Sequence, residues 1–287
     1  MNLTSIAGIK SCLQQYNLHP KKMLGQNFLY DRNVLHKILA TAELSTEDTV
    51  VEIGPGLGVM TQELLAQAQR VGVIEFDFGL QMLWEEQKQK NEHLFCLFQD
   101  VLEVDIEAWL QAQTGWSPTE GFKVCANIPY NITTPIVFQL LTACPHLVSA
   151  TLMMQKEVAQ RMVALPGTKA YGRLTLTVGY YAQVESLLTV SRRCFYPQPE
   201  VDSVVVRLTP HREKPVVVNS EAKLMELIQA AFSQRRKMIL NPMSNFWQIE
   251  KSAMAEVLIS LGIDPHARAE NLSLQAFAQV VNNFIPQ

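Results

Sequence analysis

The stretch Val50-Val-Glu-Ile-Gly-Pro-Gly-Leu-Gly58 decides the fold, because a short apolar run leads directly into a glycine-rich turn. Val50–Ile53 has the length and composition of a buried strand, and a helical pattern follows Gly58. Glycines let the backbone turn tightly at the end of a strand and approach a ligand closely. The stretch therefore predicts a strand, a ligand-binding loop and a helix, although a turn that only joins two elements also fits the loop.

Outward from this stretch, short apolar runs alternate with helical patterns, which indicates βαβ units and a parallel sheet covered by helices. Tyr171–Tyr181 scores as a strand by propensity but would also suit a packed helix, so its structure stays open. Val201–Leu208 predicts a further strand, and Thr209–Asn219 resembles a linker. Strands are expected at Val50–Ile53, Val71–Ile74, Leu94–Phe98, Lys123–Ala126 and Ala150–Met154. Helices are expected at Met60–Gln69, Leu80–Lys90, Ile106–Gln111, Pro135–Ala143, Glu221–Phe232, Ala253–Leu261 and Leu274–Phe284, and a short one after Asp264-Pro265.

The composition excludes several classes of protein. With 287 residues, 48% hydrophobic and 18% charged, the chain is typical of a globular protein with one sizeable core and a smaller unit. No apolar run approaches the roughly 18 residues that a membrane helix needs, and no secretory signal pattern is present. The five cysteines lack a C-x-x-C pair and the six histidines are scattered. We therefore expect a cytoplasmic protein without disulfides, metal or membrane contact.

The charge distribution is uneven although the net charge is only −3. Residues 1–150 hold 9 Lys and Arg against 16 Asp and Glu, a net of −7. Residues 151–287 hold 15 against 11, a net of +4, and the first 37 residues hold five basic residues against one acidic. Basic segments on an acidic body could bind a polyanion along one face, but a solvated surface of mixed charge explains the counts equally well.

A cofactor site is expected where the first strands end. Glu75 lies 21 residues after Gly54, where a carboxylate can accept hydrogen bonds from two ribose hydroxyls. This arrangement fits a dinucleotide as well as S-adenosylmethionine. Val59 stands where the dinucleotide fingerprint has its third glycine, and Glu52 suits a sulfonium and an ammonium better than a pyrophosphate. S-adenosylmethionine is therefore favoured, and Asp100 at the end of the third strand could bond its adenine amino group.

Asn127-Ile-Pro-Tyr130 follows the apolar run Val124-Cys-Ala126 and suits alkylation of an exocyclic amine on a nucleobase. The lone pair of adenine N6 is delocalised into the ring, so the amine is a poor nucleophile. A side-chain and a backbone carbonyl that accept its two N–H bonds would favour a pyramidal nitrogen, whose lone pair can attack. The proline helps to fix the neighbouring carbonyl, and the aromatic ring can stack on an extruded base. A strand that ends in an ordinary Asn/Pro turn is the alternative.

Eight motifs follow one another along nearly the whole chain, and each is too short to be specific alone. They are Leu24-Gly-Gln-Asn-Phe-Leu29, Glu52-Ile-Gly-Pro-Gly-Leu-Gly58, Gln99-Asp-Val-Leu102, Asn127-Ile-Pro-Tyr130, Gln155-Lys-Glu-Val-Ala-Gln-Arg161, Tyr171-Gly-Arg-Leu174, Phe195-Tyr-Pro-Gln-Pro-Glu-Val-Asp-Ser203 and Ala231-Phe-Ser-Gln-Arg-Arg-Lys237. In this order they resemble the KsgA/RsmA-type ribosomal RNA small-subunit adenine dimethyltransferases. The resemblance implies an α/β fold: a Rossmann-like methyltransferase domain at residues 1–211 with a basic N-terminal arm, and a small all-α domain at residues 212–287.

The resemblance also implies roles at the matching positions. The residues expected to bind S-adenosylmethionine are Asn27, Leu29, Gly54, Gly56, Glu75, Asp100 and Asn127. The residues expected to hold the target base are Asn127, Ile128, Pro129, Tyr130 and Phe195, with Tyr130 and Phe195 stacked on either side of it. The residues expected to contact RNA are Lys21, Lys22, Arg161, Arg173, Arg235, Arg236 and Lys237, although a solvated turn would also explain the last three.

The substrate that the resemblance implies is a pair of adjacent adenosines in the 3′-terminal hairpin loop of 16S rRNA, each methylated twice. The partner would be the immature 30S subunit, with the chain acting as a monomer. Within Tyr171–Tyr181 the resemblance favours a helix. Ile128 stands where this family more often has leucine, and isoleucine is also common there in the erythromycin-resistance 23S rRNA methyltransferases, which are the nearest alternative. A ribosome-assembly factor and a DNA adenine methyltransferase stay open as further alternatives, although the chain has no room for a separate DNA-recognition domain.

Overall fold

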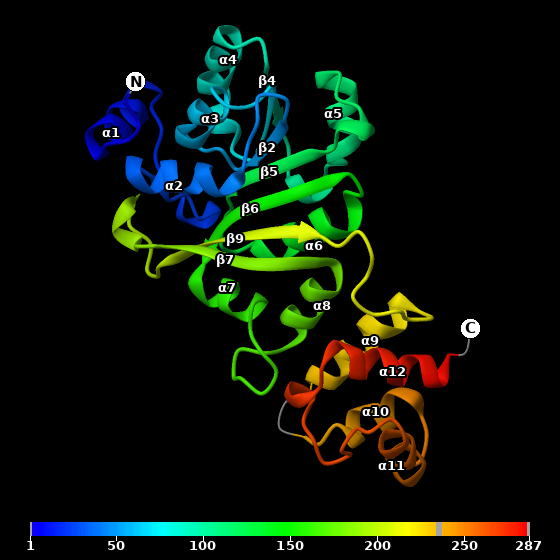
Figure 1. The fold of residues 1–287 in the computed structure, drawn as a ribbon. Helices are drawn as coiled ribbons and strands as arrows, with labels where there is room; N and C mark the ends of the chain where they lie inside the picture. The colour runs from blue at the N-terminus through cyan, green and yellow to red at the C-terminus, as the bar shows by residue number, and fades with distance from the viewer. Residues whose placement is uncertain (1, 234–236, 286–287) are drawn as a thin grey trace. The chain divides into compact units, whose positions relative to one another are not determined.

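The structure is a computed structural model that describes residues 2–233 and 237–285 (Figure 1). The chain forms two compact units: Met1–Ala159 with Val184–Pro210, and Gln160–Gln183 with His211–Gln287. The domain boundary expected between residues 211 and 212 stays a prediction. The compact units differ from it in that residues 160–183 pack with the second unit. No helix among the described residues is long and apolar enough to cross a bilayer.

The first unit is built on a seven-stranded sheet with the order β4-β3-β2-β5-β6-β9-β7 (Figure 1). Strands β2 to β6 run parallel, and β9 pairs antiparallel with β6. The chain order reverses beside β2, which has β3 on one side and β5 on the other. Ligands of open α/β sheets bind at such a reversal, outside the carboxyl ends of the strands. The strands are β2 (Thr49–Ile53), β3 (Arg70–Glu75), β4 (Leu94–Phe98), β5 (Phe122–Asn127), β6 (Leu147–Gln155), β7 (Ala182–Val190) and β9 (Ser203–Pro210).

Helices cover both faces of this sheet because successive strand residues point to opposite sides. Val71 and Val73 share a buried core with α1 to α4. The intervening Gly72 faces the other side, where a Cβ would lie 2.7 Å from Trp109 of α5. The helices of this unit are α1 (Ile6–Gln15), α2 (Arg32–Ala42), α3 (Val59–Leu64), α4 (Gln81–Lys90), α5 (Ile106–Thr114) and α6 (Thr133–Ala143), with α7 (Lys156–Met162) leading into the second unit. A small pair, β1 (Phe28–Leu29) and β8 (Phe195–Tyr196), joins distant segments.

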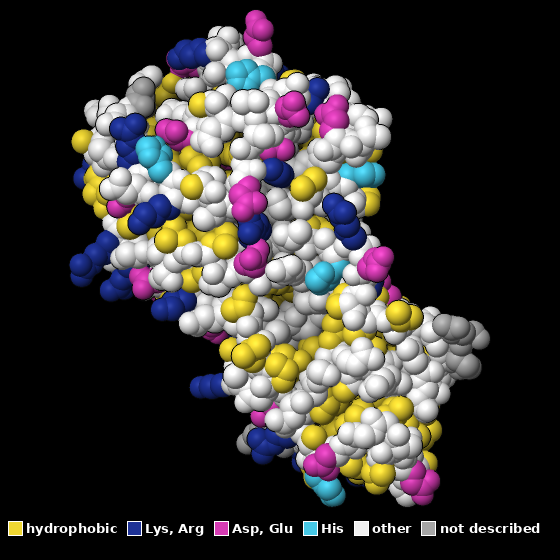
Figure 2. Space-filling view, viewed as in Figure 1, with side chains coloured by type: hydrophobic (Ala, Val, Ile, Leu, Met, Phe, Trp, Pro, Cys, Tyr) yellow, Lys and Arg dark blue, Asp and Glu magenta, His cyan; other side chains and the backbone are white. Residues whose placement is uncertain are grey.

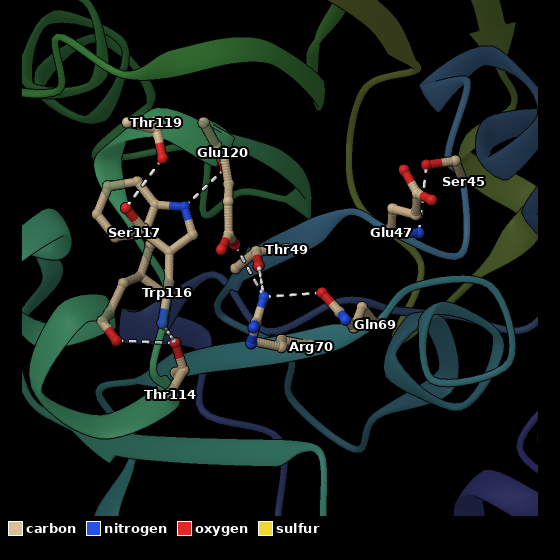
Figure 3. A network of polar contacts seen from close by, with 12 residues as sticks. Ser45, Glu47, Thr49, Gln69, Arg70, Thr114, Trp116, Ser117, Thr119 and Glu120 are labelled. Atoms are coloured by element: carbon tan, nitrogen blue, oxygen red, sulfur yellow. Dashed lines mark hydrogen bonds and ion pairs between the residues drawn. The ribbon is translucent and has the colours of Figure 1, made fainter.

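The amino ends of the central strands are closed by a polar network (Figure 3). Arg70, the first residue of β3, donates from Nη1 to Thr49 Oγ1 (3.3 Å), Gln69 Oε1 (2.8 Å) and Glu120 Oε2 (3.0 Å). Nearby, Trp116 Nε1 donates to the Gly121 carbonyl at 2.7 Å. This edge of the sheet is therefore filled by side chains. The opposite edge, where the glycine-rich turn lies, is the one left for a ligand.

The second unit is helical and has its own core, formed by residues such as Leu224, Ile228, Phe277 and Val281. Tyr171 is buried in this core and its hydroxyl donates to the Leu272 carbonyl at 2.8 Å. The helices of this unit are α8 (Arg173–Tyr181), α9 (Glu221–Ser233), α10 (Leu240–Trp247), α11 (Lys251–Ser260) and α12 (Leu274–Phe284).

The structure confirms the five expected strands from β2 to β6 and decides the segment that the sequence left open. Tyr171–Tyr181 contains helix α8, so the strand propensity of this segment is overridden. The short helix expected after Asp264-Pro265 is wrong: Asp264 Oδ1 accepts from the His266 N–H at 2.9 Å and closes a turn instead. Strand β7, the β1–β8 pair and helix α10 were not expected.

Candidate active site

A cavity of about 290 Å³ opens at the carboxyl ends of β2, β3 and β5. It lies within the first unit and brings together segments from six parts of the chain. They are Leu3 and Ile9 near the N-terminus, residues 24–29 of the N-terminal arm, the glycine-rich turn and the start of α3 at residues 52–60, the end of β3 at residues 74–76, the end of β4 at residues 99–101, and residues 127–132 after β5. Of the residues expected to bind the cofactor, every one lines this cavity: Asn27, Leu29, Gly54, Gly56, Glu75, Asp100 and Asn127.

The glycine-rich turn needs a glycine at position 56 for two reasons. Its φ is +57°, in the left-handed region that L side chains rarely adopt, and a Cβ there would lie 3.0 Å from the Phe28 ring. Hydrogen bonds at both the N–H and the carbonyl of Gly56 also hold the turn in place. Gly56 N–H donates to Glu75 Oε2 at 3.0 Å, and Trp84 Nε1 donates to the Gly56 carbonyl at 3.1 Å. The backbone therefore forms a fixed floor to the cavity.

Glu75 presents a carboxylate at the end of β3 with only 6% of the residue exposed. Its Oε2 accepts the Gly56 N–H bond, and its Oε1 accepts from the Asp77 N–H at 2.8 Å. Burial raises the pKa of Glu75 above its ordinary value, and these backbone hydrogen bonds offset part of that effect. Each oxygen keeps a lone pair, so the carboxylate can accept further bonds from two neighbouring hydroxyls.

Glu52, the last but one residue of β2, is a second buried carboxyl group in the wall of the cavity. Thr61 Oγ1 donates to its Oε2 at 2.5 Å. Burial raises the pKa of Glu52 to about 8; the Thr61 bond opposes this shift, and the nearby charge of Glu75 adds to it. A group with this pKa is mostly neutral at pH 7 and would ionise when a cation enters the cavity.

Asn127, at the end of β5, has its amide orientation fixed by the N-terminal arm. Its Nδ2 donates to the Asn27 carbonyl at 3.2 Å, so Oδ1 is the amide atom left to accept a bond in the cavity. The next residue, Ile128, also lines the cavity, and its carbonyl receives no hydrogen bond from the residues that the structure describes. Pro129 O, by contrast, already accepts from Thr133 Oγ1 at 3.2 Å. Two acceptors, one side-chain and one backbone, therefore follow each other at the end of this strand.

The two aromatic residues expected to hold the base are placed differently. Tyr130 lines the cavity, and its hydroxyl shares a hydrogen bond of 2.6 Å with Ser203 Oγ in β9. Phe195 is 2% exposed, pairs with Leu29 through the β1–β8 ladder and belongs to the hydrophobic core of this unit. It does not line the cavity. Its expected stacking on the base therefore stays a prediction, for which this position gives no support.

Asp100 lines the cavity at the end of β4, but its carboxylate also caps a turn. Its Oδ1 accepts from the Leu102 N–H at 3.0 Å. Gln139 of α6 donates from Nε2 to the carbonyls of Val101 (2.6 Å) and Val104 (2.9 Å), which braces the segment that carries Asp100.

The residues expected to contact RNA are spread over both units. Lys21 and Lys22 are exposed in the N-terminal arm, but Lys21 Nζ lies 2.5 Å from Asp77 Oδ1. Arg173 is exposed at the start of α8 and Arg161 is half-buried in α7. Arg235 and Arg236 lie outside the described residues, and Lys237 is exposed.

Sequence reasoning missed several residues around the site. Phe76, 53% exposed, lines the cavity directly after Glu75 and offers an aromatic face, and Asp77 ties the arm to the end of β3. Their position beside Glu75 was the available signal. Figure 2 shows Lys and Arg side chains along the left edge of the first unit, beside α1 and α2 and also below them. Exposed basic residues of these helices are Lys10, Arg32 and Lys37.

Comparison with known proteins gives consistent results. The chain matches the family model described as "Ribosomal RNA adenine dimethylase" over residues 17–285. It is 39% identical over 280 residues to the ribosomal RNA small subunit methyltransferase A of Geobacillus kaustophilus (strain HTA426), covering 96% of this chain and 95% of the relative.

Two solved structures share the architecture. One is a dimethyladenosine transferase from Plasmodium falciparum, with a TM-score of 0.72 and 28% identity, covering 89% of this chain and 96% of that one. The other is the 23S rRNA methyltransferase ErmE, with a TM-score of 0.67 and 27% identity, covering 91% of this chain and 100% of that one. The chain therefore belongs to the ribosomal RNA adenine dimethylase family of S-adenosylmethionine-dependent methyltransferases.

Proposed function

We propose that this enzyme transfers methyl groups to N6 of two adjacent adenosines in the 3′-terminal hairpin loop of 16S rRNA, giving N6,N6-dimethyladenosine at both. It would act as a monomer in the cytoplasm, on the nearly finished 30S subunit. The observation that carries the proposal is that Asn127 and Ile128 line the same cavity as Glu75, with the Asn127 amide oriented by its Nδ2 bond to the Asn27 carbonyl. The naming of the Geobacillus relative as a small-subunit methyltransferase supports the choice of rRNA.

The cavity fits S-adenosylmethionine on the chemistry of its donors and acceptors. Glu75 would accept bonds from the two ribose hydroxyls, Asp100 from the adenine amino group, and the exposed ring of Phe76 would stack on the adenine. Gly54 and Gly56 would allow close backbone approach, with Asn27 and Leu29 covering the other side. Bound S-adenosylmethionine supplies a methyl group already activated on a sulfonium.

The chain's own contribution to the chemistry is to position and tune the amine. Asn127 Oδ1 and the Ile128 carbonyl would each accept one N6–H, which favours a pyramidal nitrogen whose lone pair faces the donor. Pro129 has no N–H and a fixed φ, so it holds these two acceptors in place. The monomethylated amine has one N–H left, so one acceptor is released in the second round. Tyr130 would stack on the base.

RNA would bind through cations on both units. Lys22, Arg161, Arg173 and the Arg235-Arg-Lys237 segment are the candidates from the sequence, and the exposed Lys10, Arg32 and Lys37 extend them. Contacts of this kind bind phosphates without reading sequence, so they would set affinity and salt dependence.

One prediction follows from the pKa of Glu52. The free group has a pKa of about 8, and the positive charge of S-adenosylmethionine favours its ionised form, so binding should release a proton. Affinity should therefore rise with pH, by up to about tenfold per unit, and level off above about pH 8. Calorimetry from pH 6 to 9 in buffers of different ionisation enthalpy measures both effects. Glu52→Gln keeps the shape of the side chain but cannot ionise. Ionisation of the cofactor itself affects both proteins alike, so the part of the pH dependence of affinity that comes from Glu52 should be absent in the variant. Equal slopes in both proteins would contradict the prediction.

The proposed substrate is tested by offering labelled S-adenosylmethionine with unmethylated 30S particles, naked 16S RNA and 23S RNA in parallel. We expect label in 30S particles, at two adenosines near the 3′ end. Label in 23S RNA alone would favour the activity of the ErmE type, to which the fold is also similar. Binding to 30S without label would favour an assembly factor. Either result would overturn the proposal.

A further inference from the structure

The N-terminal arm, residues 21–29, runs across the mouth of the cavity and is fixed at both sides of it. On the substrate side, Asn27 O accepts the Nδ2 bond of Asn127 at the end of β5. On the cofactor side, the arm meets Asp77, two residues beyond Glu75 at the end of β3. Between these two points, residues 24–29 line the cavity. The arm therefore spans the carboxyl ends of β3, β2 and β5, which lie side by side in the sheet.

Asp77 is a nearly buried carboxylate whose oxygens are both taken by the arm. Lys21 Nζ donates to Oδ1 at 2.5 Å and Gln26 Nε2 donates to Oδ2 at 2.7 Å, while the Gly79 N–H adds a third bond at 2.9 Å. The side chain of Asp77 is only 4% exposed, whereas that of Lys21 is 52% exposed. Burial alone would raise the pKa of Asp77, but these donors hold it below its ordinary value. A buried carboxylate needs such partners, and it loses much more than a surface pair when one is removed.

The arm is folded so that Lys21 and Gln26 reach Asp77 together. Gln26 Oε1 accepts from the Lys21 N–H at 2.8 Å, and the Leu24 N–H donates to the Lys21 carbonyl at 3.0 Å. The Gln26 amide thus closes the turn with its oxygen and donates a hydrogen bond to Asp77 from its nitrogen. Residues 21–26 form a compact loop held by a single carboxylate.

We propose that Asp77 is a positioning residue for the cofactor, and that Lys21 and Gln26 serve with it as a clasp that holds the arm over the cavity. The Asp77 N–H also donates to Glu75 Oε1, so the clasp and the proposed ribose carboxylate share one turn of backbone. Opening the clasp would free residues 21–26, while β1 stays paired with β8, and it would loosen Glu75 at the same time. Lys21 thereby contributes to the binding of S-adenosylmethionine, through Asp77, and not to the binding of RNA. This inference rests on the proposed function only in placing the cofactor in this cavity.

Adjacent lysines provide a matched test. Lys21 and Lys22 have the same charge and are both exposed. Of these two lysines, only Lys21 forms an ion pair with another residue that the structure describes. We expect Lys21→Ala in the full chain to weaken S-adenosylmethionine binding by about tenfold in calorimetry, because a charged hydrogen bond to a buried carboxylate is lost. Lys22→Ala should bind the cofactor as the wild type does. Lys21→Arg, which keeps the charge, should recover most of the affinity.

Two further measurements separate positioning from folding and from catalysis. The KM for S-adenosylmethionine should rise in Lys21→Ala while kcat at saturating cofactor stays near the wild-type value, because the clasp touches no reacting atom. The double variant of Asp77→Asn and Lys21→Ala should lose less cofactor affinity than the sum of the losses in the two single variants, as expected for partners in one interaction. Because Lys21→Ala takes one donor from the buried Asp77, its thermal midpoint should fall below that of Lys22→Ala, so cofactor binding is compared at a temperature at which both variants are folded.

The outcomes of this test are distinct from those of the substrate test. Wild-type cofactor affinity in Lys21→Ala, combined with weaker binding of 30S particles, would overturn the clasp and return Lys21 to the RNA contacts. A fall in kcat with unchanged KM would overturn it as well. Because cofactor binding is measured without RNA, these results do not depend on which RNA the enzyme methylates.

Discussion

Replacing Asn127 with alanine should lower methyl transfer by roughly a hundredfold or more, the usual effect of losing one preorganised polar contact in an active site. The change removes Oδ1, which would accept an N6–H, and it leaves Glu75 and the glycine-rich turn in place. Binding of 30S particles should persist, because no basic segment is altered. The second methylation should suffer at least as much as the first, since the monomethylated amine has one N–H left. Counting methyl groups per particle over time by mass spectrometry measures both steps.

The structure adds a control for this variant. Asn127 Nδ2 also holds the Asn27 carbonyl of the arm, so alanine could act through the arm instead of the amine. Asn127→Asp keeps an acceptor but removes the donor to Asn27. If cofactor affinity is normal in Asn127→Ala while transfer is lost, the amide acts on the target. Near-normal methylation in Asn127→Ala would mean that this residue only ends a strand.

Glu75→Ala should weaken S-adenosylmethionine binding by a few kcal/mol, because two charge-assisted hydrogen bonds to the ribose would be lost. The carboxylate also accepts the N–H groups of Gly56 and Asp77, so the variant loses part of the cavity floor as well. Binding of RNA should be nearly unchanged. Calorimetry with S-adenosylmethionine checks the first expectation, and a filter-binding assay with 30S particles checks the second.

Glu75→Gln separates the two contributions. It keeps one acceptor and the shape of the side chain but has no charge, so its loss should fall between those of the wild type and Glu75→Ala. Cofactor affinity equal to the wild type in Glu75→Ala would remove this residue from the ribose site.

The parallel sheet could be predicted because its signals are local. Each of the five strands from β2 to β6 is a short apolar run bounded by polar or glycine residues, and the turn after β2 is marked by its glycines. Segments whose structure depends on distant partners could not be predicted. Tyr171–Tyr181 is rich in strand-forming residues, yet it is a helix because Leu176 and Tyr180 are buried in the core of the second unit. β1 and β8 are two residues long and exist only through pairing across more than 160 positions.

The candidate site likewise contains residues that local sequence signals could predict and residues whose positions depend on distant partners. Gly54, Glu75, Asp100 and Asn127 each end a strand or begin a turn, and parallel strands bring such ends to one edge, so the spacing of motifs was enough. The burial of Phe195 and the ion pair between Lys21 and Asp77 depend on how the arm folds back over the sheet. No periodicity in the sequence records that contact. The sequence therefore grouped Lys21 with the residues expected to contact RNA, because nothing in it indicates the pairing of Lys21 with Asp77.

In the proposed base site, the fixed amide of Asn127 would distinguish between purines. The bond from Nδ2 to the Asn27 carbonyl fixes which amide atom is the oxygen, so Oδ1 and the neighbouring Ile128 carbonyl are the two acceptors proposed for the target base. An exocyclic amino group satisfies both, whereas the 6-oxo group of guanine or hypoxanthine would place its lone pairs against them. A mismatch of this kind costs far more than a missing methyl group. In the proposed site, the arm would therefore also contribute to the base preference of the enzyme, through one hydrogen bond made 100 residues away in the chain.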